Sequence, residues 1–159
     1  MARASKDCAV APDRLPQPKA LKLRAEDAED LGVLSACLQD ALVSVRDLAY
    51  DAAERTFILV ANRFRWENES GAPERVLCGL AFSDIDGVFY RGFRRSEEDR
   101  ILSLLAIRPL MPEENVIHLD FAAGAEIRLS ASLIRCHARD LGEPWPTPWR
   151  PSHLMDEPA

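Results

Sequence analysis

Apolar and polar residues alternate along much of this chain, and a period of two is typical of half-buried β-strands. A strand is also predicted over residues 56–66, where both faces are apolar at first and turn polar from Asn62 onwards. The alternation predicts further strands over residues 21–25, 42–50, 75–82, 88–93, 115–122 and 126–130. Short polar connections separate them, and Asp86-Gly87 predicts a tight hairpin turn between residues 82 and 88. Such connections favour a mainly antiparallel sheet.

Two segments have the three- and four-residue spacing of amphipathic helices. Residues 27–41 repeat apolar positions at this spacing, and four acidic residues at 26–30 complement the positive end of a helix dipole. A second helix is predicted from Ser132, a suitable N-cap, to Leu141, before Gly142 and Pro144. Residues 101–107 are continuously apolar, so their pattern does not separate strand from helix. We expect a buried strand there.

The predicted fold is a single α+β domain over residues 20–142. Its sheet is expected to be a mainly antiparallel bent sheet or a PH-like barrel of about seven strands, with an N-terminal strand-helix unit and a C-terminal helix. This element order resembles pleckstrin-homology-type folds, an analogy that identifies no ligand. Residues 1–19, with three prolines and no periodicity, are expected to form a disordered arm, and residues 143–159 an extended Pro/Trp-rich tail.

The segment 116–130 carries the most specific structural prediction. Its apolar residues at 117, 119, 121, 127 and 129 must share the core face. We expect Phe121 opposite Ile127, with Gly124 at the centre of a three-residue loop where a left-handed conformation suits glycine. The same register places Asp120 opposite Arg128 as an exposed ion pair.

Composition narrows the range of functions. The chain has 20 Lys and Arg against 26 Asp and Glu, a formal charge of -6 that disfavours non-specific attraction to nucleic acid or anionic lipid. An apolar run of the ~18 residues needed for a membrane helix is missing, as is an apolar N-terminal signal, so we expect a cytoplasmic protein. The four cysteines are widely spaced without a C-x-x-C pair and are expected to be reduced.

Known catalytic and metal motifs are not evident. His118, His137, Cys136 and Cys78 lack the paired spacing of a zinc site, so we expect no metal. The serines have no nucleophile-elbow glycines, and the glycines form neither a phosphate loop nor a dinucleotide fingerprint, so we expect no cofactor.

Two clusters of arginine and aromatic residues are the best candidates for a binding site. Their members are Arg63, Arg65 and Trp66 in one, and Arg91 and Arg95 in the other. Guanidinium groups beside aromatic rings suit phosphate, carboxylate or stacked bases. Alternatively, these arginines cover sheet edges and pair with neighbouring glutamates.

From these clusters we expect a non-catalytic binding or interaction module for an anionic partner, either a protein or a small molecule. An RNA-binding protein and an unrecognised small enzyme are the alternative functions. The sequence leaves the oligomeric state open.

Several segments together resemble one protein family. They include NRFRWE at 62–67, FAAGAEIRL at 121–129 and DLGEPW at 140–145, and also residues 21–31, 39–41, 74–76 and 104–107. Over residues 20–153 the chain resembles domain-of-unknown-function family 2948 of alphaproteobacteria. The resemblance implies a small cytosolic protein, and it carries over no catalytic residue. Residues 1–19 lie outside it.

Overall fold

The computed structural model describes residues 20–68, 71–148 and 150–151. Within them, one nine-stranded sheet has the order β1-β9-β4-β3-β2-β6-β7-β8-β5, and every neighbouring pair is antiparallel. The strands are β1 (Lys22–Ala25), β2 (Leu42–Asp51), β3 (Thr56–Phe64), β4 (Glu74–Phe82), β5 (Ile85–Arg91), β6 (Ile101–Met111), β7 (Val116–Phe121), β8 (Glu126–Ala131) and β9 (Cys136–Pro146). The expected α+β class with a mainly antiparallel sheet is therefore confirmed.

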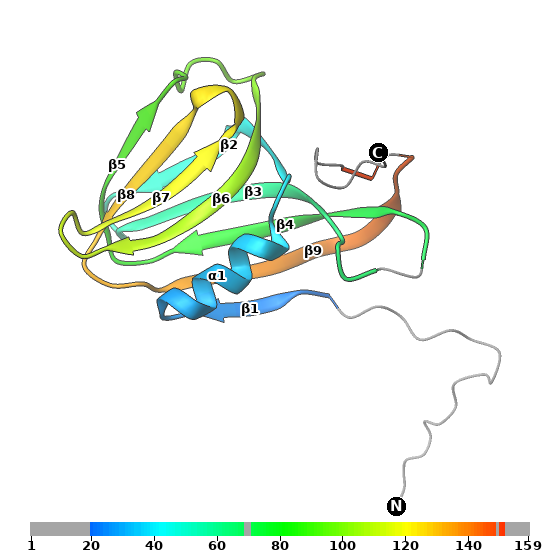
Figure 1. Cartoon of the computed structure of the whole chain (residues 1–159). Helices are drawn as coiled ribbons and strands as arrows, with labels where there is room; N and C mark the ends of the chain where they lie inside the picture. The colour runs from blue at the N-terminus through cyan, green and yellow to red at the C-terminus, as the bar shows by residue number, and fades with distance from the viewer. Residues whose placement is uncertain (1–19, 69–70, 149, 152–159) are drawn as a thin grey trace, which may run out of the picture.

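The sheet curls around a single hydrophobic core (Figure 1). Phe57 and Phe82 contribute from β3 and β4, with ring centroids 6.4 Å apart, and Leu119 and Ile127 contribute from β7 and β8. All four side chains are fully buried. Burial of each such side chain contributes about 1.5–3 kcal/mol, so the core holds the two halves of the sheet together.

The helix α1 (Ala28–Cys37) packs against β1 and β6, which lie far apart in the sheet order (Figure 1). Asp27 is its N-cap and accepts a hydrogen bond from the Asp30 N–H at 2.7 Å. Leu31 and Leu34 are fully buried. The helix ends sooner than the predicted residue 41. Among the described residues, no helix is long and apolar enough to cross a membrane.

The predicted C-terminal helix is wrong, because the chain forms β9 there. Cys136, Ala138 and Asp140 are buried while His137 and Arg139 are exposed, which is a period of two. The buried Asp140 conceals this pattern in the sequence, since an acid on a core face is readily taken for a solvent position. The predicted boundary at residue 142 falls inside β9, and the arm 1–19 lies outside the described residues.

The strand count also differs from about seven. Residues 101–111 form β6, which confirms the strand expected in the apolar run. The nine strands and the missing C-terminal helix, in the part of the chain that the structure describes, depart from the PH-type element order.

The predicted hairpin at Asp86-Gly87 is wrong. β4 pairs with β3 and β9 on its two sides, so β5 instead pairs with β8 in the other half of the sheet. Gly87 lies at an irregularity of the β5–β8 register, and Asp86 pairs with Arg55 at 2.6 Å.

The hairpin of β7 and β8 has the predicted core face but not the predicted register. Asp120 lies opposite Glu126, and His118 opposite Arg128. A shift of two residues leaves every side chain on its face, so the apolar pattern does not detect it. The loop is longer than predicted, with Phe121 N–H donating to the Ala125 carbonyl at 2.9 Å. Within it the φ of Gly124 is 78°, the left-handed conformation expected.

Candidate functional site

The structure does not bring the predicted arginine residues together on one exposed surface. Arg63 and Arg65, at the end of β3, are 0% and 2% exposed, and Trp66 is half-buried. Arg91 and Arg95 are exposed at the end of β5 and just beyond it. β3 and β5 are not neighbours in the sheet. The two clusters therefore differ in both place and environment.

Arg63 is buried between two carboxylates. Its Nε and Nη2 atoms donate to the two carboxylate oxygens of Asp140 at 2.8 Å each. Its Nη1 and Nη2 atoms donate to Glu67 at 3.1 and 2.7 Å. Burial raises the pKa of the Asp140 carboxyl, but the hydrogen bonds from Arg63 and the Leu21 N–H, together with the charges of Arg63 and Arg65, hold that pKa below its usual value. The Leu21 N–H also donates to Asp140, at 2.7 Å, and so links β1 to the pair.

The other residues around Arg63 also bind within the protein. Arg65 pairs with Glu74 and donates its N–H to the Glu74 carbonyl at 2.9 Å. Trp66 Nε1 donates to the Gln39 carbonyl at 3.0 Å. These contacts match the alternative interpretation, in which the arginines pair with nearby glutamates.

Arg95 is similarly engaged. Its guanidinium lies 5.2 Å from the centroid of the Tyr90 ring and donates to the Leu48 carbonyl at 2.9 Å. Arg91 lies 3.9 Å from Glu126, and its side chain is 69% exposed. Of the four predicted arginines, Arg91 thus has the weakest contacts within the protein.

The cysteines that the structure describes are free thiols. Cys78 and Cys136 are buried, and burial raises the pKa of each thiol to about 12. Cys37 is only half-buried. Cys136 and His137 point to opposite faces of β9, so they do not form a Cys–His pair.

A cluster on the outer face of β7 and β8 contains possible metal ligands. The ligand atoms of His118, Asp120 and Glu126 lie within 4.8 Å of one another. Arg108 binds two of these groups, with Nε 2.6 Å from Asp120 and Nη2 3.1 Å from Glu126. Arg128 lies 3.7 Å from Glu126 as well. The positive charge that a metal ion would supply already comes from arginine, so we interpret the cluster as an ion-pair network.

Acid should weaken this network through Glu126. The hydrogen bond to His118 lowers the pKa of Glu126 below its ordinary value of 4.5, against the opposing effect of burial. The unfolded chain therefore binds this proton more readily, and the stabilisation present above pH 4.5 is lost as the pH falls through the lower folded pKa. We expect Glu126→Gln to be less stable than wild type at about pH 5, with a smaller difference at about pH 3.

Urea unfolding at both pH values measures this difference. The exposed Glu143→Gln is the matched control and should show little change with pH. A deficit of Glu126→Gln that stays constant with pH would contradict the proposed contribution.

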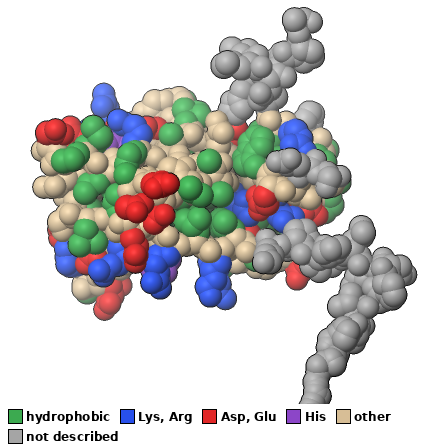
Figure 2. Space-filling view, turned by 60° about the horizontal axis from the view of Figure 1, so that its bottom comes forward, with side chains coloured by type: hydrophobic (Ala, Val, Ile, Leu, Met, Phe, Trp, Pro, Cys, Tyr) green, Lys and Arg blue, Asp and Glu red, His purple; other side chains and the backbone are tan. Residues whose placement is uncertain are grey.

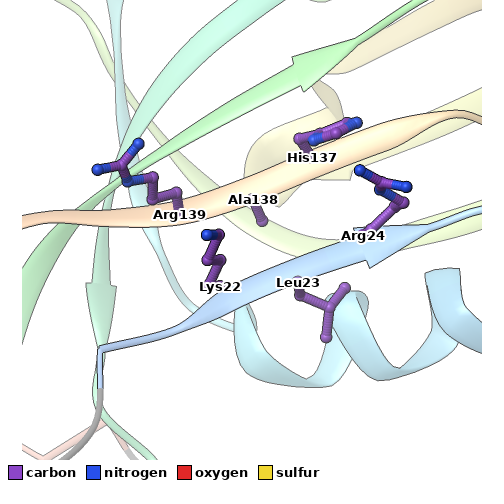
Figure 3. A pocket seen from close by; sticks show the side chains of 6 residues that line it. All are labelled: Lys22, Leu23, Arg24, His137, Ala138 and Arg139. Carbon is purple, nitrogen blue, oxygen red and sulfur yellow. The ribbon is translucent and has the colours of Figure 1, made fainter.

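The strongest candidate site is a groove of about 450 Å³ on the outer face of β1 and β9. Four basic side chains project into it, whereas Leu23 and Ala138 point to the opposite face (Figure 3). The four are Lys22 and Arg24 of β1, and His137 and Arg139 of β9. We call this feature the basic groove. Figure 2 shows Lys and Arg side chains projecting along the lower edge of the molecule, with Asp and Glu side chains among them.

The register places two like charges in direct opposition in the basic groove, because Lys22 lies opposite Arg139. The neighbouring pair sets Arg24 opposite the imidazole of His137. Directly opposed like charges destabilise a sheet, so stability alone does not favour this arrangement. Within the part of the chain that the structure describes, one of the four groove residues forms an ion pair. Arg24 lies 3.9 Å from Glu26, and both side chains are largely exposed. The positive charge of the groove is therefore left available to a ligand.

Small residues of β4 lie beside the groove, and the Leu141 side chain covers one of them, Gly79. Gly79 lies opposite Arg139, and Ala81 opposite His137. A smaller groove of about 260 Å³ continues across the same face, and Val60 and Leu77 are among its lining residues. The lining of this smaller groove is mixed, with aliphatic side chains beside the polar Ser44, Asp47 and Asn62.

Sequence reasoning missed the basic groove for a physical reason. The sequence pattern predicts a helix over His137 and Arg139, and residues two positions apart in a helix point in different directions. In β9 they share one face, and β9 pairs with a strand more than a hundred residues earlier in the chain. The alternation around Lys22 and Arg24 predicts β1, but the sequence pattern does not predict β9 as its neighbour.

Comparisons with curated proteins and with solved structures gave no match. A family model matches residues 21–153, a range that contains the whole basic groove and the Arg63–Asp140 pair. The chain therefore belongs to the family described as a protein of unknown function, DUF2948.

Proposed function

We propose that this protein is a non-catalytic binding module and that its basic groove holds an anionic group of a partner molecule. The observation that carries the proposal is the opposition of like charges between β1 and β9. An anion between the two strands would relieve this repulsion, because it attracts both rows at once. The site differs from the arginine clusters expected from the sequence, since Arg63 and Arg65 are occupied by carboxylates.

The spacing of the groove suits a ligand with more than one negative charge. Side chains two residues apart on a strand are separated by about 6.5–7 Å, and directly opposite ones by about 4.5–5.5 Å. Four basic groups at these spacings form a rectangle. Phosphate chains and neighbouring carboxylates can contact both rows of it.

Two soluble polyanions test the proposal: tripolyphosphate and a short polyglutamate peptide. At low salt we expect both to shift the backbone NMR signals of residues 22–24 and 137–139. The variant Lys22→Glu/Arg139→Glu should bind them about tenfold more weakly or worse, because each close charge contact contributes about 1 kcal/mol in water.

The matched control is Arg91→Glu/Arg95→Glu, which changes the net charge equally and probes the second arginine cluster. We expect it to retain binding to both polyanions. Signals that shift around Arg91 instead of the groove, or affinity that survives Lys22→Glu/Arg139→Glu, would contradict the proposal. Circular dichroism would confirm that both variants fold.

A further inference from the structure

We propose that the anionic partner is an extended acidic peptide that adds to the sheet as a tenth strand beside β1. This inference rests on the proposed function of the basic groove and adds backbone pairing to it. The basic groove alone would bind any polyanion. Strand addition narrows the partner to peptides with acidic residues at alternate positions.

The first support is the open edge of β1. In the described part of the chain β1 pairs with β9 and is the last strand of the sheet on that side. The Leu21 carbonyl accepts from the Asp140 N–H of β9 at 2.9 Å. Alternate residues of an antiparallel strand direct their backbone groups to the same neighbour. Lys22 and Arg24 therefore direct their N–H and C=O groups away from β9, towards the open edge.

The second support is that the same two residues carry the cations. A residue of an added strand that exchanges hydrogen bonds with Lys22 has its side chain on the face of Lys22, about 4.5–5.5 Å away. An acidic residue there would pair with Lys22, and a second one two positions along would pair with Arg24. Leu23 faces the other way, so the intervening position does not contact the groove. The preferred motif is thus acid, any residue, acid.

The other open edge of the sheet is less available. At β5, Ile85 N–H donates to the Arg55 carbonyl at 2.9 Å, and the Ile85 carbonyl accepts from the Tyr50 hydroxyl at 2.7 Å. The following Asp86 pairs with Arg55. The start of β5 is therefore occupied by contacts within the protein.

A second copy of the chain is a poor occupant of the β1 edge. Two β1 strands placed edge to edge would set Lys22 and Arg24 against the same cations of the other copy. Short, charged edge strands are a common protection against such self-pairing. The charges that reject a second β1 attract an acidic strand, so charge complementarity selects the partner. Addition of a strand to an open sheet edge is an established mode of peptide recognition.

Hydrogen exchange tests backbone pairing directly. The probe is an acetylated heptapeptide of alternating glutamate and valine, and its control is the lysine and valine peptide. At saturating glutamate peptide, exchange of the Lys22 and Arg24 amides should slow about tenfold or more. Exchange at Leu23, already directed to β9, should change little. No slowing at Lys22 and Arg24 would overturn strand addition.

A pair of variants separates the backbone from the side chain. Lys22→Ala removes the charge, and Lys22→Pro removes the charge and the outward N–H. Proline is tolerated at the first residue of an edge strand. We expect Lys22→Pro to bind the glutamate peptide about fivefold more weakly than Lys22→Ala. The two variants should bind tripolyphosphate equally. A glutamate peptide N-methylated at its glutamates lacks the peptide N–H groups that would pair with β1. It should bind more weakly than the unmethylated peptide by a similar factor.

The outcomes distinguish this inference from the proposed function. Equal peptide binding by Lys22→Ala and Lys22→Pro, with both polyanions still dependent on Lys22 and Arg139, would reject strand addition and leave the basic groove intact. Binding of neither polyanion would reject both. Preference for single-stranded RNA over the glutamate peptide would reject the peptide class. We expect the peptide to be preferred, because the described residues that line the two neighbouring grooves include no aromatic ring on which a base could stack.

Discussion

Replacing Arg63 with methionine should lower the free energy of unfolding by about 3–5 kcal/mol. The side chain of Arg63 is fully buried, and that of Asp140 is 2% exposed. Methionine fills much of the space but leaves the Asp140 carboxylate in the core without its cation. The cost of an unpaired buried charge exceeds the cost of losing the pair as a whole. Glu67, with a side chain 44% exposed, can turn to solvent and adds less.

Urea unfolding of two further variants tests the reason for this loss. The double variant Arg63→Met/Asp140→Leu removes both charges and should recover part of the lost stability, although the Leu21 N–H then lacks its acceptor. The exposed Arg91→Met is the control and should cost within about 0.5 kcal/mol. If Arg63→Met were as mild as Arg91→Met, the buried pair would not be a structural element of the fold.

Gly92→Ala should destabilise the protein by about 3 kcal/mol or more. Gly92 has a φ of 83°, a conformation that alanine adopts only with strain. A Cβ atom here would also lie 2.4 Å from the Gly124 carbonyl oxygen and 2.9 Å from the Ala125 Cα. These are backbone atoms of the β7–β8 loop, so they cannot rotate away as a side chain would. The substitution has to displace one of the two loops.

Gly124→Ala provides the matched control for Gly92→Ala. Its φ of 78° carries a similar strain, but a Cβ there meets nothing within 4 Å. We expect a loss of about 1 kcal/mol, the cost of the backbone conformation alone. Thermal or urea unfolding of the two variants separates strain from collision. Equal losses would show that the close approach at Gly92 is readily relieved.

Local patterns in the sequence predicted those elements whose partners are near in the chain. The strands at 42–51, 56–64 and 74–82 are neighbours in the sheet in the order in which they occur in the chain, and their apolar and polar pattern predicts them. The core face of the β7–β8 hairpin was legible for the same reason. β9 was not, because Asp140 occupies a core position whose partner, Arg63, is 77 residues away. Both residues of a buried ion pair are charged, so a sequence pattern places them at the surface although they lie in the core.

The candidate site was less predictable than the fold. Arginines beside aromatic residues stood out in the sequence, but the sequence does not tell whether a guanidinium already has a carboxylate partner. The basic groove showed the reverse problem. Lys22, Arg24, His137 and Arg139 are unremarkable along the chain and become a site only through the β1–β9 register.

The insertion of β9 between β1 and β4 has a consequence for the order in which the protein can be assembled. The first and last strands that the structure describes are neighbours, so the pairing of β1 waits until the chain through Arg139 has left the ribosome. Until then β4 presents an unpaired edge to other nascent chains. Long-range pairings of this kind slow folding, because the entropy of the intervening chain is lost before the stabilising contacts form. Completion of the sheet, burial of Arg63 against Asp140 and formation of the basic groove therefore all depend on the same late segment of the chain, β9.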